Sequence, residues 1–175
     1  MNIFKEVEIV TSLKKALNDI ETYIEDPRNG LPEEVFLFVS KITPLVNVDL
    51  LVRDNAGRIL LSWRDDPYEG CGWHVPGGIV RLKESFEERL QKTALQELGC
   101  DVLYEKKPLE IVPIIKKTAN IRCHFITFVY DCRIPNGKNI STIRRKGEAG
   151  YLEWHDSYPD DMLQVHAFYS KYFQE

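Results

Sequence analysis

A glycine-rich turn and one glutamate on the helix that follows it are the groups in this sequence best suited to chemistry. The turn is Pro76-Gly77-Gly78, and Glu97 falls in the last turn of a helix predicted for residues 86–98. Because glycine lets the main chain approach a ligand closely, a carbonyl of the turn and the Glu97 carboxylate could bind the same ion. Such hard oxygen ligands, completed by phosphate oxygens and waters, suit Mg²⁺. The pair therefore predicts a magnesium site for a phosphorylated ligand.

Helical periodicity places Glu97 at the edge of an apolar face. At about 100° per residue, one stripe of the helix carries Phe86, Leu90, Ala94 and Leu98. A carboxylate buried alone is costly, and a negative charge in the last helical turn opposes the helix dipole by roughly 0.3–1 kcal/mol. A nearby cation would relieve both penalties. The alternative, which the geometry alone slightly favours, is that the apolar face has left the core at this point and Glu97 is solvated.

Basic residues must be placed locally if the ligand is an anion, because the chain has a net charge of -4 and no strongly basic face. Nucleic acid is therefore a poor candidate partner. Arg64 could contact a phosphate, or it could form a surface ion pair with Asp65 or Asp66 worth roughly 0–1 kcal/mol. For Lys92, an ion pair with Glu84, or with Glu88 at i,i+4 spacing, is a simpler explanation than ligand binding.

Two further segments carry candidate groups. The basic run Arg144-Arg145-Lys146-Gly147 precedes Glu148 and could bring this carboxylate over a pyrophosphate, whereas such runs are usually solvated. On a predicted strand, His124 shares a face with Arg122 and could act as a base in a cavity. A histidine at such a position is more often satisfied by the core or by a neighbouring strand, and that is the expectation here.

Length and composition fit one domain, since the chain has 175 residues of which 43% are hydrophobic. The four cysteines form no C-x-x-C pair and no zinc pattern, so reduced thiols are expected. The N-terminus lacks the apolar run of a signal peptide, and no apolar stretch approaches the roughly 20 residues that span a bilayer. These features predict a soluble cytoplasmic protein without a membrane partner.

The expected elements alternate between helices and strands. Helices are predicted at 7–25, 32–39, 86–98 and 160–173, and strands at 46–52, 58–63, 109–117, 122–133 and 150–154. For the first two helices packing is expected, and a dimer contact is the less favoured alternative. Ser85 and Glu88 should form a capping box at the start of the central helix, and Gly99 should end it. This order indicates an α/β (α+β) fold and not a doubly wound Rossmann fold.

The central segment resembles the Nudix family box, G-x5-E-x7-R-E-U-x-E-E-x-G-U, where U is a bulky apolar residue. Four positions match, at Gly78, Glu84, Glu97 and Gly99. Lys92 keeps the charge of the arginine, and Thr93 and Gln96 replace two glutamates. The resemblance implies a Nudix domain at residues 31–175, with a mixed β-sheet core packed between helices, after a helical extension at 1–30. The two missing carboxylates count against the multi-metal site of an ordinary Nudix pyrophosphohydrolase.

A similarly depleted box is typical of the GDP-mannose mannosyl hydrolase branch, and the likeness to this branch runs over roughly 31–173. Outside the box it includes Thr43-Pro44-Leu45-Val46, Gly72-Trp73, Val75-Pro76 and Val165-His166-Ala167. That branch binds Mg²⁺ through a loop glycine carbonyl, the helix glutamate and a later glutamine. By position these resemble Gly77, Glu97 and Glu148. The histidine that serves as its general base is Ala149 here.

The resemblance also implies substrate contacts at Arg64 and Lys92, and Gly78, Arg81 and Arg122 are further candidates for substrate binding. A structural role is favoured for Lys92 and for Glu84. The arginine that follows the glycine pair in the branch is Ile79 in this chain. Because Ala149 cannot take a proton, Glu148 is the candidate base and His124 the reserve.

Three functions remain open. The resemblance favours Mg²⁺-dependent hydrolysis of a nucleoside diphosphate sugar, with Mn²⁺ as a substitute metal, by water attack at the anomeric carbon. Ordinary Nudix chemistry at phosphorus is the second, and Thr93 and Gln96 count against it. A non-catalytic nucleotide-sugar sensor is the third, supported by Ala149. Branch members are homodimers, so a homodimer is expected by resemblance.

Overall fold

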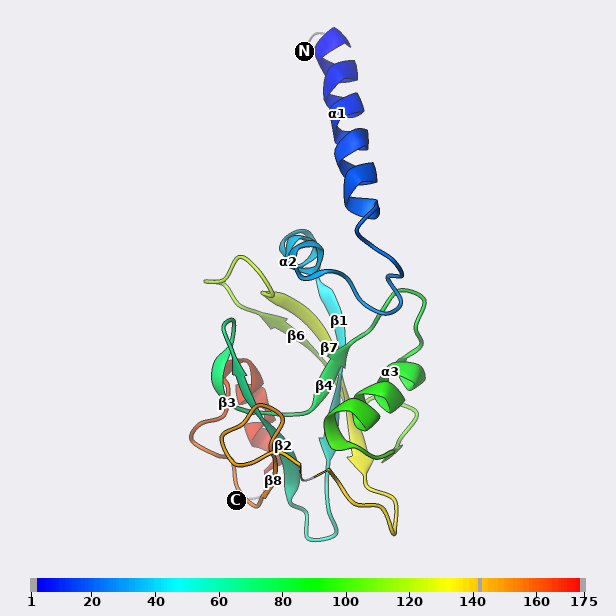
Figure 1. The fold of residues 1–175 in the computed structure, drawn as a ribbon. Helices are drawn as coiled ribbons and strands as arrows, with labels where there is room; N and C mark the ends of the chain where they lie inside the picture. The colour runs from blue at the N-terminus through cyan, green and yellow to red at the C-terminus, as the bar shows by residue number, and fades with distance from the viewer. Residues whose placement is uncertain (1–2, 142, 174–175) are drawn as a thin grey trace.

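The computed structural model describes residues 3–141 and 143–173 (Figure 1). Its helical elements are the α-helices α1 (Ile3–Glu21), α2 (Glu33–Ile42) and α3 (Phe86–Thr93), the π-helical turn η1 (Ala94–Leu98) and the 3₁₀ helix η2 (Gln164–Tyr172). Its strands are β1 (Leu45–Val52), β2 (Ile59–Asp66), β3 (Gly70–His74), β4 (Gly77–Ile79), β5 (Leu103–Tyr104), β6 (Glu110–Ile115), β7 (His124–Arg133) and β8 (Leu152–His155). None of the described helices is both long and apolar enough to cross a membrane.

The strands form two sheets. In the first, β1 pairs in parallel with β7 and antiparallel with β4, while β5 and β6 each pair antiparallel with β7. In the second, β2 lies between β3 and β8, and both pairings are antiparallel. The predicted mixed α/β architecture is therefore confirmed, with a mixed sheet and a smaller antiparallel sheet.

Strand β1 separates two apolar clusters because alternate side chains of a strand point to opposite faces. Val48, Leu50 and Val52 belong to the first cluster, together with the α3 and η1 stripe Leu90, Ala94 and Leu98. Leu51 belongs to the second cluster, which includes Trp73 of β3 and Tyr169 of η2. The predicted apolar stripe of the central helix is thus buried from Leu90 to Leu98, and Phe86 at its start is half-buried against the same cluster.

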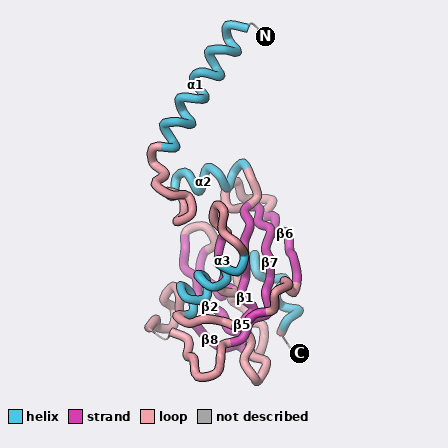
Figure 2. Tube along the Cα trace, turned by 90° about the vertical axis from the view of Figure 1, so that its right-hand side faces the viewer, coloured by secondary structure: helices cyan, strands magenta, loops and turns pink. Residues whose placement is uncertain are grey.

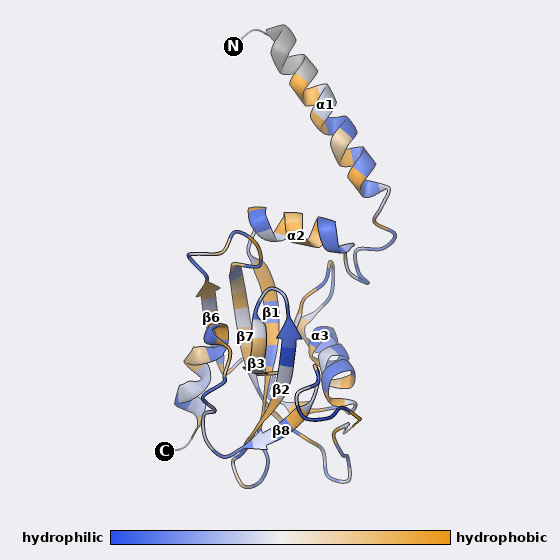
Figure 3. Ribbon diagram, turned by 60° about the vertical axis from the view of Figure 1, so that its left-hand side comes forward, coloured by the Kyte–Doolittle hydropathy of each residue, from blue (hydrophilic) through white to orange (hydrophobic). Residues whose placement is uncertain are grey.

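Helix α1 confirms the helix predicted near the N-terminus, but it begins and ends about four residues earlier than expected. It projects from the rest of the chain in all three ribbon and tube views (Figures 1, 2 and 3). Its apolar side chains Val10, Leu13 and Leu17 are exposed. Among the residues that the structure describes, the expected packing of this face is not observed. Helix α2, by contrast, is half-buried near the start of β1.

The central helix differs from the single α-helix expected. The capping box of Ser85 and Glu88 and the left-handed Gly99 are both present as predicted. Between them, the last turn widens into the π-helical turn η1 after Thr93. Widened turns of this kind often occur at functional sites. The C-terminal segment also differs, since η2 is a 3₁₀ helix that starts at Gln164 rather than an α-helix from residue 160.

Candidate active site

A cavity of about 290 Å³ lies where β1, β4, η1, the β2–β3 hairpin and η2 meet. Six of the residues selected from the sequence line it, at Arg64, Gly77, Gly78, Arg81, Glu97 and Arg122. Lys92, His124 and Glu148 are not among its lining residues. The structure therefore brings together most, but not all, of the predicted site.

The glycine turn is required by close contacts on both sides. A Cβ atom added to Gly77 would lie 2.0 Å from Oδ1 of Asp49, and one added to Gly78 would lie 2.4 Å from Oγ1 of Thr93. The turn is held against β1 by a hydrogen bond of 2.8 Å from the Leu50 amide to the Pro76 carbonyl. Any larger residue would push the turn away from β1 or α3, so glycine is needed here for space rather than for backbone freedom.

Glu97 lies in η1 and is partly buried at the cavity wall. Burial raises the pKa of this carboxyl above its usual range, and the nearby Arg64 guanidinium lowers it by a smaller amount. The solvated alternative considered from the sequence is therefore not what the structure adopts. A carboxyl group that would gain from a bound cation therefore lines the same cavity as the glycine turn.

Asp49 is a buried carboxylate in the same wall that the sequence did not single out as a site residue. Its Oδ2 accepts a 2.6 Å hydrogen bond from the Tyr169 hydroxyl, and its Oδ1 accepts one of 2.6 Å from Asn47 Nδ2. Burial raises the pKa of Asp49 to about 7, against the lowering effect of these hydrogen bonds and of Arg64. The available signal was an acid between the apolar residues Val48 and Leu50 of a predicted strand.

Two histidines, His74 and His166, also line the cavity, although neither was a candidate site residue in the sequence. Both are buried, and their ring centroids lie 5.8 Å apart. His166 Nδ1 accepts a 3.4 Å hydrogen bond from the Val75 amide, whereas His74 Nδ1 is buried without a partner. Burial, together with Arg64, lowers the pKa of His166 to about 3 and the pKa of His74 well below its usual range.

Arg122 reaches the cavity because the chain turns before β7 begins. Its φ is +47°, and its amide donates a 3.1 Å hydrogen bond to Ser40 Oγ. Its guanidinium lies 5.8 Å from the Phe36 ring centroid and 5.1 Å from that of Tyr68. The Nε atom is buried without a hydrogen-bond partner, as is Oγ1 of Thr127. Unpaired buried polar atoms at a cavity wall are typical of groups that complete their hydrogen bonds with a ligand or water.

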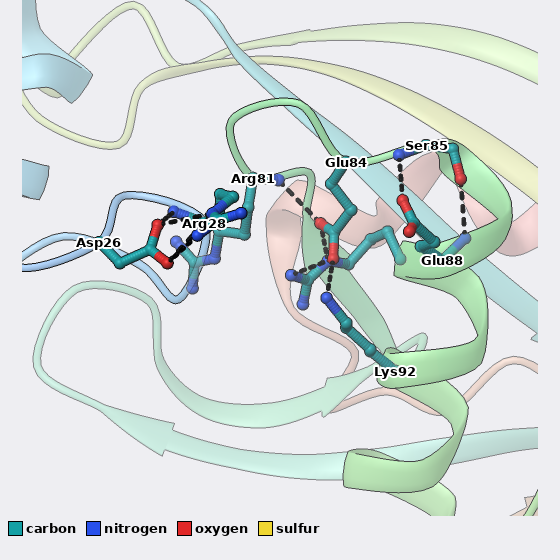
Figure 4. Close-up of polar contacts among 8 residues, drawn as sticks. Asp26, Arg28, Arg81, Glu84, Ser85, Glu88 and Lys92 are labelled. Atoms are coloured by element: carbon teal, nitrogen blue, oxygen red, sulfur yellow. Dashed lines mark hydrogen bonds and ion pairs between the residues drawn. The ribbon is translucent and has the colours of Figure 1, made fainter.

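The box residues Glu84 and Lys92 form a structural ion pair beside the cavity (Figure 4). Lys92 Nζ lies 2.9 Å from Glu84 Oε1, and Arg89 Nε lies 2.8 Å from Oε2. The Arg81 amide donates a further 2.9 Å hydrogen bond to Oε2. The structural role that the sequence favoured for Glu84 and Lys92 is therefore consistent with their geometry. Arg89 was missed because the family box gives no role to its position.

The two candidate bases lie away from the cavity. On β7, Phe125 and Thr127 point into it, so His124 lies on the opposite face of the strand. Glu148 is exposed, and its Oε2 accepts a 2.9 Å hydrogen bond from the Arg145 amide. Within residues 3–141 and 143–173 there is no cluster of three or more His, Cys, Asp or Glu side chains placed to hold a metal ion.

Comparison with known proteins agrees with this geometry. The NUDIX domain family matches residues 43–167, which is more than half of the chain, so the protein belongs to this family. Fold and family together define a Nudix-domain protein.

Individual relatives give finer likenesses. The chain is 33% identical over 89 residues to the low-salt glycan biosynthesis protein Agl8 of Haloferax volcanii, an alignment that covers 51% of this chain and 56% of that protein. The MutT NUDIX hydrolase from Burkholderia pseudomallei superposes with a TM-score of 0.58 and 25% identity, over 75% of this chain and 99% of that one. A UDP-X diphosphatase structure superposes with a TM-score of 0.54 and 20% identity, over 94% and 76% of the two chains. The last likeness concerns the fold alone.

Proposed function

We propose that the protein is a Mg²⁺-dependent hydrolase of a nucleoside diphosphate sugar that releases the sugar and the nucleoside diphosphate. The observation that carries the proposal is the single cavity in which Glu97 and the Gly77-Gly78 turn lie with Arg64, Arg81 and Arg122. A metal-binding acid surrounded by guanidinium groups suits a pyrophosphate. The likeness to a protein named for glycan biosynthesis supports a sugar at the other end of the substrate.

The space next to the cavity supports a nucleoside as well as a sugar. A second hollow of about 360 Å³ shares Ile79, Arg81 and Arg122 with the first and is lined further by Phe36 and Tyr68. Aromatic rings of this kind can stack on a nucleobase. Together the two hollows reach the size usual for sites that hold ligands of this type.

The residues present fit a magnesium ion that takes much of its shell from the substrate. Glu97 supplies one carboxylate, whose raised pKa shows the cost of leaving its charge buried without a cation. Gly77 would supply a carbonyl, and Glu148 a third oxygen if the loop at 144–150 moved. Gly147 and Gly150 in this loop both have left-handed φ angles, of +87° and +84°. When bound, the ion would neutralise charge that develops on the departing diphosphate.

The side chains of the cavity would orient the substrate for attack by water at the anomeric carbon. Arg64, Arg81 and Arg122 would bind phosphate oxygens and hold the sugar next to the glycine turn. The oxygen of the attacking water would bond to the anomeric carbon, and the bond from that carbon to the diphosphate oxygen would break. Attack at phosphorus is the alternative, and the absent box carboxylates at Thr93 and Gln96 count against it.

The test is to incubate the full chain with Mg²⁺ and GDP-, ADP-, UDP- and CDP-sugars in ¹⁸O-labelled water, and to identify products by mass. Diphosphate plus labelled sugar is expected. Monophosphate plus sugar phosphate would support the phosphorus alternative. Saturable binding without products would support the sensor alternative. Glu97→Gln is the matched negative control, since it removes the proposed metal ligand while keeping the shape of the side chain.

A further inference from the structure

His74 is a buried cavity residue to which neither the Nudix box nor the proposed metal site gives a role. It ends β3, three positions before Gly77, and is 5% exposed. The preceding Trp73 packs into the second apolar cluster, while His74 lines the cavity together with Glu97. Its Nδ1 is buried without a hydrogen-bond partner. Such an atom is uncommon in a folded protein and indicates a ligand or water that completes it.

The proposed reaction needs a proton acceptor that the expected positions do not provide. Ala149 has no titratable group, and neither Glu148 nor His124 lines the cavity. We propose that the imidazole of His74 accepts the proton of the attacking water. This inference rests on the proposed function, because it names the base of that same reaction.

The surroundings of His74 keep the ring able to accept a proton at neutral pH. Burial, together with Arg64 and His166, lowers its pKa well below the usual range, so the ring is neutral. The other charged groups that line the cavity are Asp49, Glu69, Glu97, Arg81, Arg89 and Arg122. A bound diphosphate would place negative charge beside these arginines, which favours the protonated imidazole as the reaction proceeds.

The step balances without a further reactant. Nδ1 of His74 takes one proton from the water, and the oxygen forms its bond to the anomeric carbon. The bond from that carbon to the diphosphate oxygen breaks, and its electron pair leaves with the nucleoside diphosphate. The imidazolium then returns its proton to solvent. The net change is one water consumed, and one sugar, one nucleoside diphosphate and one proton formed.

His166 offers a matched control within the same cavity. Like His74 it is buried, and the two rings lie 5.8 Å apart. Its Nδ1 already accepts a hydrogen bond from the Val75 amide, so it is not free to take a proton from water at that atom. Replacing either histidine by glutamine removes a buried ring from the same region, but only the His74 change removes the proposed base.

The experiment compares wild type, His74→Gln, His74→Asn and His166→Gln on the sugar nucleotide that wild type hydrolyses. We expect His74→Gln and His74→Asn to lower kcat by about 10²–10⁴-fold, the usual contribution of a general base, with KM changed less than about threefold. His166→Gln should lose no more than about tenfold. Melting temperature and binding of the nucleoside diphosphate product establish that each variant is folded.

A third measurement needs no substitution. The kcat of wild type should stay constant as pH decreases through 6.5 and should fall only in more acidic solution, because the lowered pKa keeps the imidazole of His74 neutral near pH 6.5. A kcat for His74→Gln within threefold of wild type, or an equal loss in His166→Gln, would overturn the inference while leaving the proposed function intact. Absence of turnover by wild type on every sugar nucleotide would overturn both.

Discussion

The hydroxyl of Tyr169 donates a 2.6 Å hydrogen bond to Oδ2 of Asp49, and this contact joins η2 to the cavity wall. The two residues are 120 positions apart, and both are buried. Asp49 Oδ1 in turn lies beside Gly77, where a Cβ atom would meet it at 2.0 Å. The C-terminal segment therefore supports the glycine turn through one carboxylate, although it carries none of the family box.

Tyr169→Phe should destabilise the protein by about 1–3 kcal/mol, because it removes a donor from a buried carboxylate. Urea unfolding followed by circular dichroism measures the change. Tyr172→Phe is the matched control, since the Tyr172 hydroxyl also donates a 2.6 Å hydrogen bond, to Glu110, but in a half-buried setting. Its expected cost is below about 1 kcal/mol. Equal losses in the two variants would show that Asp49 has another source of stabilisation.

The ion pairs of Glu84 predict that the free energy of unfolding decreases in acidic solution. Burial raises the pKa of this carboxyl, but hydrogen bonds from Arg89, Lys92 and the Arg81 amide outweigh burial and lower the pKa to about 2. A pKa lower in the folded state contributes stability above the unfolded value of about 4.3, which is lost as pH falls toward 2. Unfolding free energies from pH 7 to pH 2.5 should therefore decrease more steeply in wild type than in Glu84→Gln. Parallel curves would contradict the role of this pair.

His166 predicts a second loss of stability in mildly acidic solution. Its pKa is lowered to about 3 by burial and by Arg64, so the unfolded chain binds a proton near pH 6.5 that the folded chain does not. The contribution of the neutral His166 to the free energy of unfolding is therefore complete above pH 6.5, and it decreases as pH falls toward 3. His166→Gln should flatten the curve between pH 6.5 and 5, where Glu84 contributes little. A slope unchanged by the substitution would mean that another group titrates there.

Features of the fold that depend only on residues close together in the sequence were predictable. The capping box of Ser85 and Glu88, the left-handed Gly99 and the apolar stripe ending at Leu98 each depend on neighbours within a few positions, and all three are present. The widened turn after Thr93 was not predictable, because the spacing of apolar residues fits a regular α-helix equally well.

Candidate site residues were predictable where a motif marks them, and not where distant segments meet. Gly77 and Glu97 were found from the turn, the helical wheel and the family box. The contact between His74 and His166 depends on how β3 packs against η2. The spacing of apolar residues along the sequence cannot predict a contact between such distant segments. The side of β7 on which His124 lies was not predictable for a related reason, since a strand pattern defines two faces but not which of them faces the cavity.

Removal of the metal should abolish turnover if the proposed site is correct. EDTA should reduce hydrolysis by at least about 10²-fold, with recovery on addition of Mg²⁺ or Mn²⁺. Glu97→Gln should give a similar loss that excess Mg²⁺ only partly restores. Glu87→Gln is the control, because Glu87 is exposed on the preceding helix α3 and does not line the cavity. Full activity of Glu97→Gln would remove this residue from the site.

Arg64 should affect substrate affinity more than the chemical step. It lines the cavity and lies 3.6 Å from Asp66, a separation that leaves the guanidinium available to a phosphate. Arg64→Gln should raise KM by about 10–100-fold, the loss expected for one or two charge-assisted hydrogen bonds. Arg58→Gln is the control, because Arg58 is hydrogen-bonded to Asp54 outside the cavity. This substitution should leave KM unchanged. Equal effects in the two variants would indicate a general loss of positive charge instead.

Two substitutions of Glu148 would show whether this residue is a metal ligand or the general base. Glutamine keeps an oxygen ligand but cannot take a proton, so Glu148→Gln should retain kcat within about threefold if the residue completes the magnesium shell after movement of its loop. Glu148→Ala should raise the Mg²⁺ concentration needed for half-maximal rate by about tenfold or more. Magnesium titrations of both variants at saturating substrate provide the measurement. A loss of kcat in Glu148→Gln as large as that in His74→Gln would identify Glu148 as the base, and an unchanged magnesium requirement in Glu148→Ala would exclude it from the site.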